Sequence, residues 1–99
     1  MQSPIMRLKF ANKYWNVVFK RIAGDVVFGE VDEKTKTITL SPMAGSESFT
    51  LLNVAVHEFL HAEFPDMSED KIDDAGYNLA RALWRMGAQI VTYEVESDG

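Results

Sequence analysis

The stretch VAVHEFLHAEFPD at residues 54–66 lies in the part of the sequence where strand-like periodicity has given way to helical periodicity. From about Ser48 onward, apolar residues recur at helical spacing, and they are Leu52, Ala55, Val56, Phe59 and Leu60. Pro65 disfavours the α conformation at the residue before it, so this helix is expected to end near Phe64. The stretch therefore predicts a partly buried helix over residues 48–64.

A second helix is expected directly after this stretch. Ser68 suits an N-cap. Glu69 and Asp70 would lie in the first turn, where the helix dipole favours negatively charged side chains. An apolar stripe follows, made of Ile72, Ala75, Leu79, Ala82, Leu83 and Met86. Gly87 is a natural C-terminal stop. Because the connection at residues 65–67 is short, the second helix should return antiparallel to the first.

The residues before the helices have the pattern of strands. Residues 6–10 and 36–40 alternate between apolar and polar side chains, and residues 14–22 and 26–31 are rich in β-branched and aromatic residues. Turns at residues 23–25 and 32–35 predict an antiparallel β meander. Residues 88–95 alternate loosely and predict a possible C-terminal strand. The fold class expected is α+β: an N-terminal antiparallel meander, two antiparallel helices and this last strand.

Length and composition limit the classes of protein to which this chain can belong. The 99 residues suffice for one domain, expected over residues 1–99. The net charge of −5 and the pI of about 4.9 argue against nucleic-acid binding. No cysteine is present, so any metal must be bound by His, Asp and Glu. No apolar run reaches the roughly 20 residues of a membrane span, and the N-terminus lacks a signal-peptide core. A cytoplasmic location without membrane contact is therefore expected.

The two histidines of the chain, His57 and His61, lie four positions apart with Glu58 between them. Residues four apart share one face of a helix, so both imidazoles can bind one ion. Glu58 lies about 100° round the helix from His57 and can reach a water held by a metal. This H-E-x-x-H arrangement predicts a zinc site with Glu58 as the general base. The competing interpretation is an ordinary helix with two surface histidines and no metal.

A catalytic zinc needs a third protein ligand, and no third histidine exists. The carboxylate candidates are Glu63, Asp66, Glu69, Asp70, Asp73 and Asp74. If the chain reverses near Asp66, Asp73 lies level with the two histidines, which makes it the favoured ligand, with Glu69 as the alternative. Tyr77, one turn after Asp73, could donate a hydrogen bond to the oxyanion of a tetrahedral intermediate. A His₂-carboxylate set also suits Fe²⁺ and other divalent ions, although the motif favours Zn²⁺.

The segment HEFLHAEFPDMSEDKIDDAGYNLARALWRMG, together with GEVDEKTKTITL upstream, resembles small phage and bacterial zinc metallopeptidase-like proteins. These minimal zincins are loosely similar to the SprT-like and ImmA/IrrE groups. The resemblance covers roughly residues 26–87. It implies a bacterial or phage-infected host cytoplasm, zinc binding by His57 and His61, and a base at Glu58. It also implies an acidic third ligand on the following helix, which supports Asp73.

Three functions remain open from the sequence. The first is a zinc-dependent metallopeptidase whose peptide or protein substrate pairs with residues 36–40, taken as an edge strand. The second is a non-catalytic, zinc-containing binding or regulatory module of the same fold. The third is a metal-free structural protein. The sequence does not indicate an oligomeric state.

Overall fold

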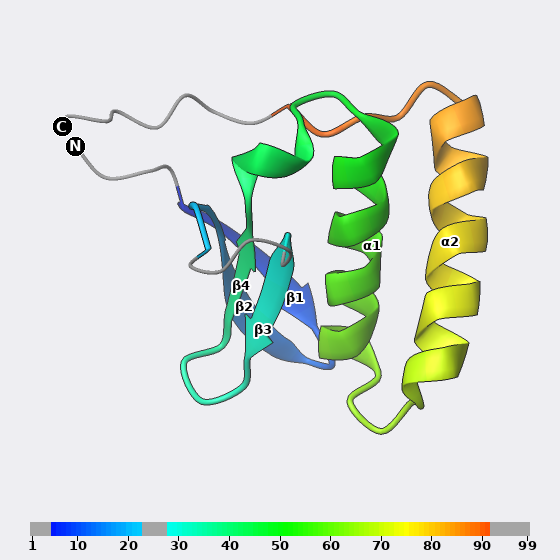
Figure 1. Ribbon diagram of the computed structural model, residues 1–99. Coiled ribbons are helices and arrows are strands. Elements are labelled where there is room, and N and C mark those ends of the chain that lie inside the picture. The colour runs from blue at the N-terminus through cyan, green and yellow to red at the C-terminus, as the bar shows by residue number, and fades with distance from the viewer. Residues whose placement is uncertain (1–4, 23–27, 92–99) are drawn as a thin grey trace, which may run out of the picture.

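The computed structural model describes residues 5–22 and 28–91. It has an α+β fold, as predicted, in which a four-stranded sheet is followed by two helices (Figure 1). The strands are β1 (Ile5–Phe10), β2 (Lys13–Phe19), β3 (Gly29–Asp32) and β4 (Thr37–Leu40). A short 3₁₀ helix at Pro42–Ala44 leads into α1 (Phe49–Glu63) and then α2 (Glu69–Arg85).

The sheet is not the simple meander that the sequence predicted. Its strand order is β1-β2-β4-β3, so the two hairpins are antiparallel but β2 and β4 pair in parallel. Residues 37–40 therefore form an interior strand, and the prediction of an edge strand at 36–40 was wrong. β4 carries the more buried side chains, with Ile38 fully buried and Leu40 1% exposed, whereas β3 alternates half-buried and exposed residues. An interior position suits the first pattern and an edge position the second.

One further strand prediction differs from the structure, and part of the N-terminal prediction lies outside the described residues. Residues 88–91 form no strand, and residues 92–95 lie outside the described residues. The turn predicted at 23–25 and the first two residues of the strand predicted at 26–31 also lie outside them.

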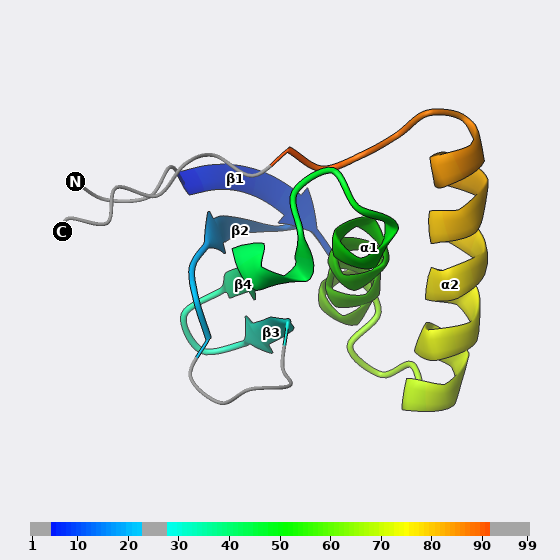
Figure 2. The ribbon, with the colours of Figure 1, turned by 45° about the horizontal axis from the view of Figure 1, so that its top comes forward.

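The core lies between one face of the sheet and α1. Trp15, Val17 and Phe19 of β2 pack with Ile38 and Leu40 of β4, and α1 contributes Leu51, Ala55 and Ala62. Helix α2 lies on the far side of α1, so that α1 is enclosed between the sheet and α2 (Figure 2). Both helices thus lie on the same side of the sheet, with only α1 packed directly against it.

Local signals place the helix ends where the sequence predicted them. The Ser48 and Ser68 side chains accept hydrogen bonds from the backbone N–H groups of Leu51 and Lys71 respectively, which caps each helix. Helix α1 ends at Glu63 with Phe64 as its C-cap, next to Pro65. Gly87 follows α2 with a φ of 97°, a backbone conformation that favours glycine. Within the described residues, no helix combines the length and apolar character needed to cross a membrane.

Candidate metal centre

The two histidines of α1 point toward one another on the side of the helix that is not covered by the sheet. Their Nε2 atoms are 3.1 Å apart, and both side chains are partly buried. The four-residue spacing places them one turn apart on the same face, as the sequence predicted. Two imidazole nitrogens at this separation could supply two ligands to one metal ion.

Glu69, in the first turn of α2, completes the cluster. Its Oε2 lies 3.1 Å from His57 Nε2, and its Oε1 lies 3.1 Å from His61 Nε2. The antiparallel return of α2 brings this turn opposite the C-terminal half of α1. His57, His61 and Glu69 are thus three side chains whose ligating atoms are close enough to share one metal ion.

Asp73 lies one turn further along α2 and contacts the other nitrogen of the His57 ring. Its Oδ1 is 3.3 Å from His57 Nδ1. An Nδ1–H that donates to this carboxylate leaves Nε2 with its lone pair directed at the cluster, which is the tautomer that binds a metal. The residue favoured from the sequence as third ligand, Asp73, therefore lies where a carboxylate could orient the His57 ring, and the alternative, Glu69, faces both Nε2 atoms.

The donor set fits Zn²⁺. Ligands of a tetrahedral Zn²⁺ with bonds of about 2.0–2.1 Å are separated by about 3.3 Å. The Nε2 atoms are 3.1 Å apart, and a different oxygen of the Glu69 carboxylate lies 3.1 Å from each of them, which is close to that value. Two imidazoles and one carboxylate leave a fourth position open, which is the composition of a catalytic rather than a structural zinc site.

Glu58 points to the sheet side of the same helix turn and is only 8% exposed. Burial raises the pKa of its carboxyl group, the neighbouring His57 lowers it, and the negative charges of Glu69 and Glu30 raise it further. The net direction is upward from the ordinary value. Glu58 is therefore a buried carboxyl group beside the cluster, with a proton affinity above that of an exposed glutamate.

Gly29, at the start of the edge strand β3, lies against Glu58. A Cβ atom at this position would come within 3.0 Å of Glu58 Cγ and Oε2, and within 2.6 Å of Val54 Cγ1. Only glycine allows the strand to approach the helix so closely. Sequence reasoning did not assign this role, although a glycine opening an alternating strand is a signal of close backbone approach.

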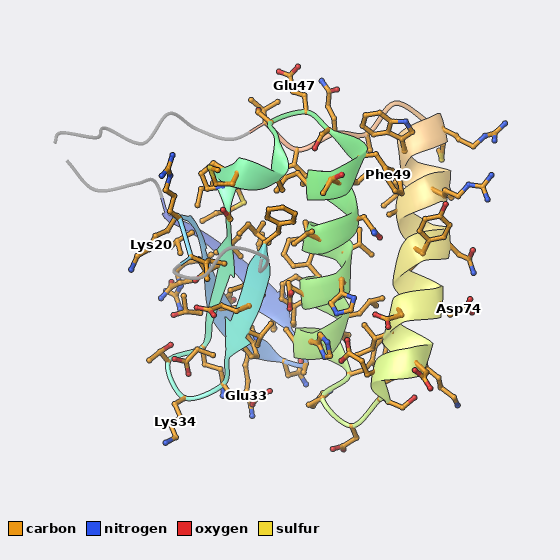
Figure 3. The ribbon with its side chains drawn as sticks, viewed as in Figure 1. Lys20, Glu33, Lys34, Glu47, Phe49 and Asp74 are labelled. Atoms are coloured by element: carbon orange, nitrogen blue, oxygen red, sulfur yellow. The ribbon has the colours of Figure 1, made fainter. Side chains whose placement is uncertain are left out.

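The remaining candidates lie away from the cluster. The Tyr77 ring packs edge-on against Phe49, with centroids 5.8 Å apart, and Phe49 is the first residue of α1, at the opposite end of that helix from His61. Glu63 accepts a hydrogen bond from the Ala11 backbone N–H, and Asp74 points outward from α2, as its label in Figure 3 shows. Asp66 and Asp70 are exposed and belong to no group of potential metal ligands within the described residues.

Comparisons with family models, with curated proteins and with solved structures found no match to this chain. The resemblance to minimal zincins consequently rests on the motif and its flanking sequence.

Proposed function

We propose that this protein is a zinc-dependent metallopeptidase. The observation that carries the proposal is the convergence of both His57 and His61 Nε2 atoms on the carboxylate of Glu69, with each separation at 3.1 Å. Glu58, the expected general base, lies in the same turn of α1. The proposed ligands and the proposed base thus come from two helices that pack against each other.

Zn²⁺ at this centre would supply a Lewis acid that polarises a peptide carbonyl and lowers the pKa of water. His57 and His61 would hold the ion with Glu69, while Asp73 fixes the ring of His57. Glu58 would accept a proton from the attacking water and deliver it to the leaving amine. Burial raises the pKa of Glu58, which suits a base that must keep a proton between these two steps.

The substrate is expected along β3, because β3 and not β4 is the sheet edge near α1. An extended peptide can add to an exposed edge through main-chain hydrogen bonds. Gly29 supports this arrangement, since its close approach to Glu58 brings that edge next to the proposed base. A peptide bond lying there would be next to Glu58.

The test combines metal content with cleavage. Protein purified without nickel affinity should contain one zinc per chain, and His57→Ala should lose it. The wild type should cleave a mixed peptide library, read by mass spectrometry, whereas Glu58→Gln should keep its zinc and lose cleavage. Asp74→Asn, on the outer side of α2, is the matched control and should resemble the wild type in both measurements.

Three results would contradict the proposal. Protein that contains no metal and takes up none from added Zn²⁺ would return His57 and His61 to ordinary helix residues. Cleavage by Glu58→Gln at the wild-type rate would remove the assigned base. Bound zinc without cleavage of any peptide by the wild type would instead favour a non-catalytic zinc module of the same fold.

A further inference from the structure

The charges of this protein are strongly segregated along the chain. Half of its ten lysines and arginines lie within residues 1–24, and this segment contains no aspartate or glutamate. The rest of the chain carries all fifteen acidic residues against five basic ones. The net charge of −5 is therefore the sum of a basic N-terminal hairpin and an acidic remainder, and it does not describe the hairpin's surface.

The hairpin displays part of this charge on the face of the sheet opposite the helices. Strand alternation turns Trp15, Val17 and Phe19 of β2 toward α1, so the residues between them face the other way. Lys9 pairs directly with Tyr14 across the hairpin, and both share this outer face with Arg7. Lys20 extends from the end of β2 away from the helices (Figure 3). We call the surface formed by Arg7, Lys9, Tyr14 and Lys20 the basic face.

An aromatic ring lies among these cations. Tyr14 is 58% exposed, with the Arg7 guanidinium carbon 5.0 Å and the Lys9 ammonium nitrogen 5.6 Å from its ring centroid. Within the described residues, no helix covers this face (Figure 2), and none of its cations forms an ion pair with a carboxylate. Both cations are exposed, so each can move from the ring to an external anion.

The acidic part of the sheet is too distant to neutralise this face. Glu30 and Asp32 lie on β3, which is separated from β1 by two intervening strands and from β2 by one. At about 4.8 Å per strand, these distances are about 14 Å and about 10 Å, and both exceed the Debye length of about 8 Å at physiological ionic strength. The basic face therefore presents a positive potential of its own.

From this arrangement we propose that the basic face binds single-stranded nucleic acid. Exposed cations that contact phosphates, beside an aromatic ring that can stack on a base, are the two elements of sequence-independent single-strand binding. An acidic polypeptide would use the cations, but unlike a nucleic acid it carries no base in every repeat unit that could stack on the exposed ring. The face lies on the side of the sheet opposite the histidines, so nucleic acid can bind without blocking the metal centre.

Fluorescence anisotropy with a labelled oligodeoxythymidylate tests the proposal, starting at low salt. The wild type should bind, and Arg7→Gln combined with Lys9→Gln should weaken binding roughly tenfold and reduce the log–log salt slope by about 1.4, because two phosphate contacts are lost. Arg81→Gln combined with Arg85→Gln changes the net charge equally on α2 and should leave the affinity close to that of the wild type. Tyr14→Leu should weaken binding roughly tenfold through lost stacking.

Three results would overturn the proposal. The first is no binding by the wild type at low salt. The second is an equal loss from the two double substitutions, because binding would then follow net charge alone. The third is displacement of the oligonucleotide by polyglutamate at equal charge concentration, with Tyr14→Leu binding like the wild type, which would identify an acidic polypeptide as the ligand. Zinc content, measured in parallel, should be the same in all of these variants.

Discussion

The two helices that carry the candidate metal centre are anchored very differently. Helix α1 is enclosed between the sheet and α2, and six of its fifteen residues are buried. Helix α2 packs chiefly on α1 and buries only Ile72, Gly76 and Ala80 of its seventeen residues. Gly76 has no side chain and Ala80 has only a methyl group, so α2 gains little hydrophobic stabilisation from its buried residues.

This difference separates the proposed metal-binding residues into two kinds. His57 and His61 are placed by a helix that the core holds, and their mutual geometry follows from one turn of that helix. Glu69 and Asp73 come from a helix that is held mainly along one narrow strip. A metal ion at the centre would consequently stabilise the position of α2 much more than that of α1.

Metal removal should reveal the contrast most strongly. At a free zinc concentration about a thousandfold above its Kd, bound metal stabilises the fold by about 4 kcal/mol, and chelation should remove this contribution. Hydrogen exchange should then increase first in residues 64–85, while the amides of α1 that face the sheet remain protected. Denaturation with and without chelator measures the first effect, and exchange followed by mass spectrometry measures the second. His57→Ala should show no response to chelator, and a uniform increase across both helices would contradict the unequal anchoring.

Substitutions on α2 should separate the ligand from the orienting residue. Glu69→Gln removes a negatively charged donor that faces both Nε2 atoms, so it should reduce zinc affinity most. Asp73→Asn keeps the shape but weakens the contact with His57 Nδ1, with an expected loss of about 10- to 100-fold. Asp74→Asn is the exposed neighbour and should change nothing. Competition with a chromogenic chelator gives all three affinities, and a larger loss from Asp73→Asn than from Glu69→Gln would exchange the two roles.

The sequence predicted best what is decided locally. Ser48, Ser68 and Pro65 mark helix ends through contacts or steric restrictions within a few residues, and the spacing of His57 and His61 is a property of one helix. Strand order depends on contacts between distant segments. Both β3 and β4 are four residues long, and nothing in either sequence alone states which of them β2 will pair with.

The proposed third ligand is a second feature that the sequence could not predict, because it depends on how one imidazole ring is oriented. Reflection about Asp66 placed Asp73 level with the histidines, and Asp73 does contact His57. The contact is made by Nδ1, however, whereas Nε2 points one turn away, toward Glu69. The height of a residue on a neighbouring helix can be estimated from loop length, but the direction of an imidazole ring depends on side-chain rotamers and packing.

Two glycines on opposite sides of α1 allow a matched test of how tightly each side is packed. A methyl group at Gly29 would overlap Val54 Cγ1 at 2.6 Å, and Val54 has little rotamer freedom in a helix, so Gly29→Ala should destabilise the fold by about 1–3 kcal/mol. A methyl group at Gly76 would lie 3.6 Å from Leu60 Cδ1 and 3.7 Å from His57 Cα, which are ordinary contacts. Gly76→Ala should therefore stabilise the fold by up to about 1 kcal/mol, because it removes a glycine from a helix interior. Urea denaturation compares the pair, and an equal effect of the two substitutions would contradict the tighter packing on the sheet side.

The smallest effect is expected at Glu58, which is held by the firmly anchored helix and whose ionisation His57 partly favours. Burial raises its pKa in the folded state above the ordinary value of 4.5 that it regains on unfolding. Below pH 4.5 the group is protonated in both states and burial incurs no charge penalty. As the pH rises through the window between 4.5 and the raised pKa, the unfolded chain releases its proton first, so the metal-free protein loses stability.

Glu58→Gln cannot ionise and should exceed the wild type in stability at neutral pH under chelation, with the difference closing as the pH falls toward 4.5. Denaturation midpoints across this pH range measure the difference, with Asp74→Asn as an exposed control that should follow the wild type throughout. A Glu58→Gln protein that is less stable than the wild type at neutral pH would show that the buried carboxylate is stabilised in its charged form, which is opposite to the effect of burial.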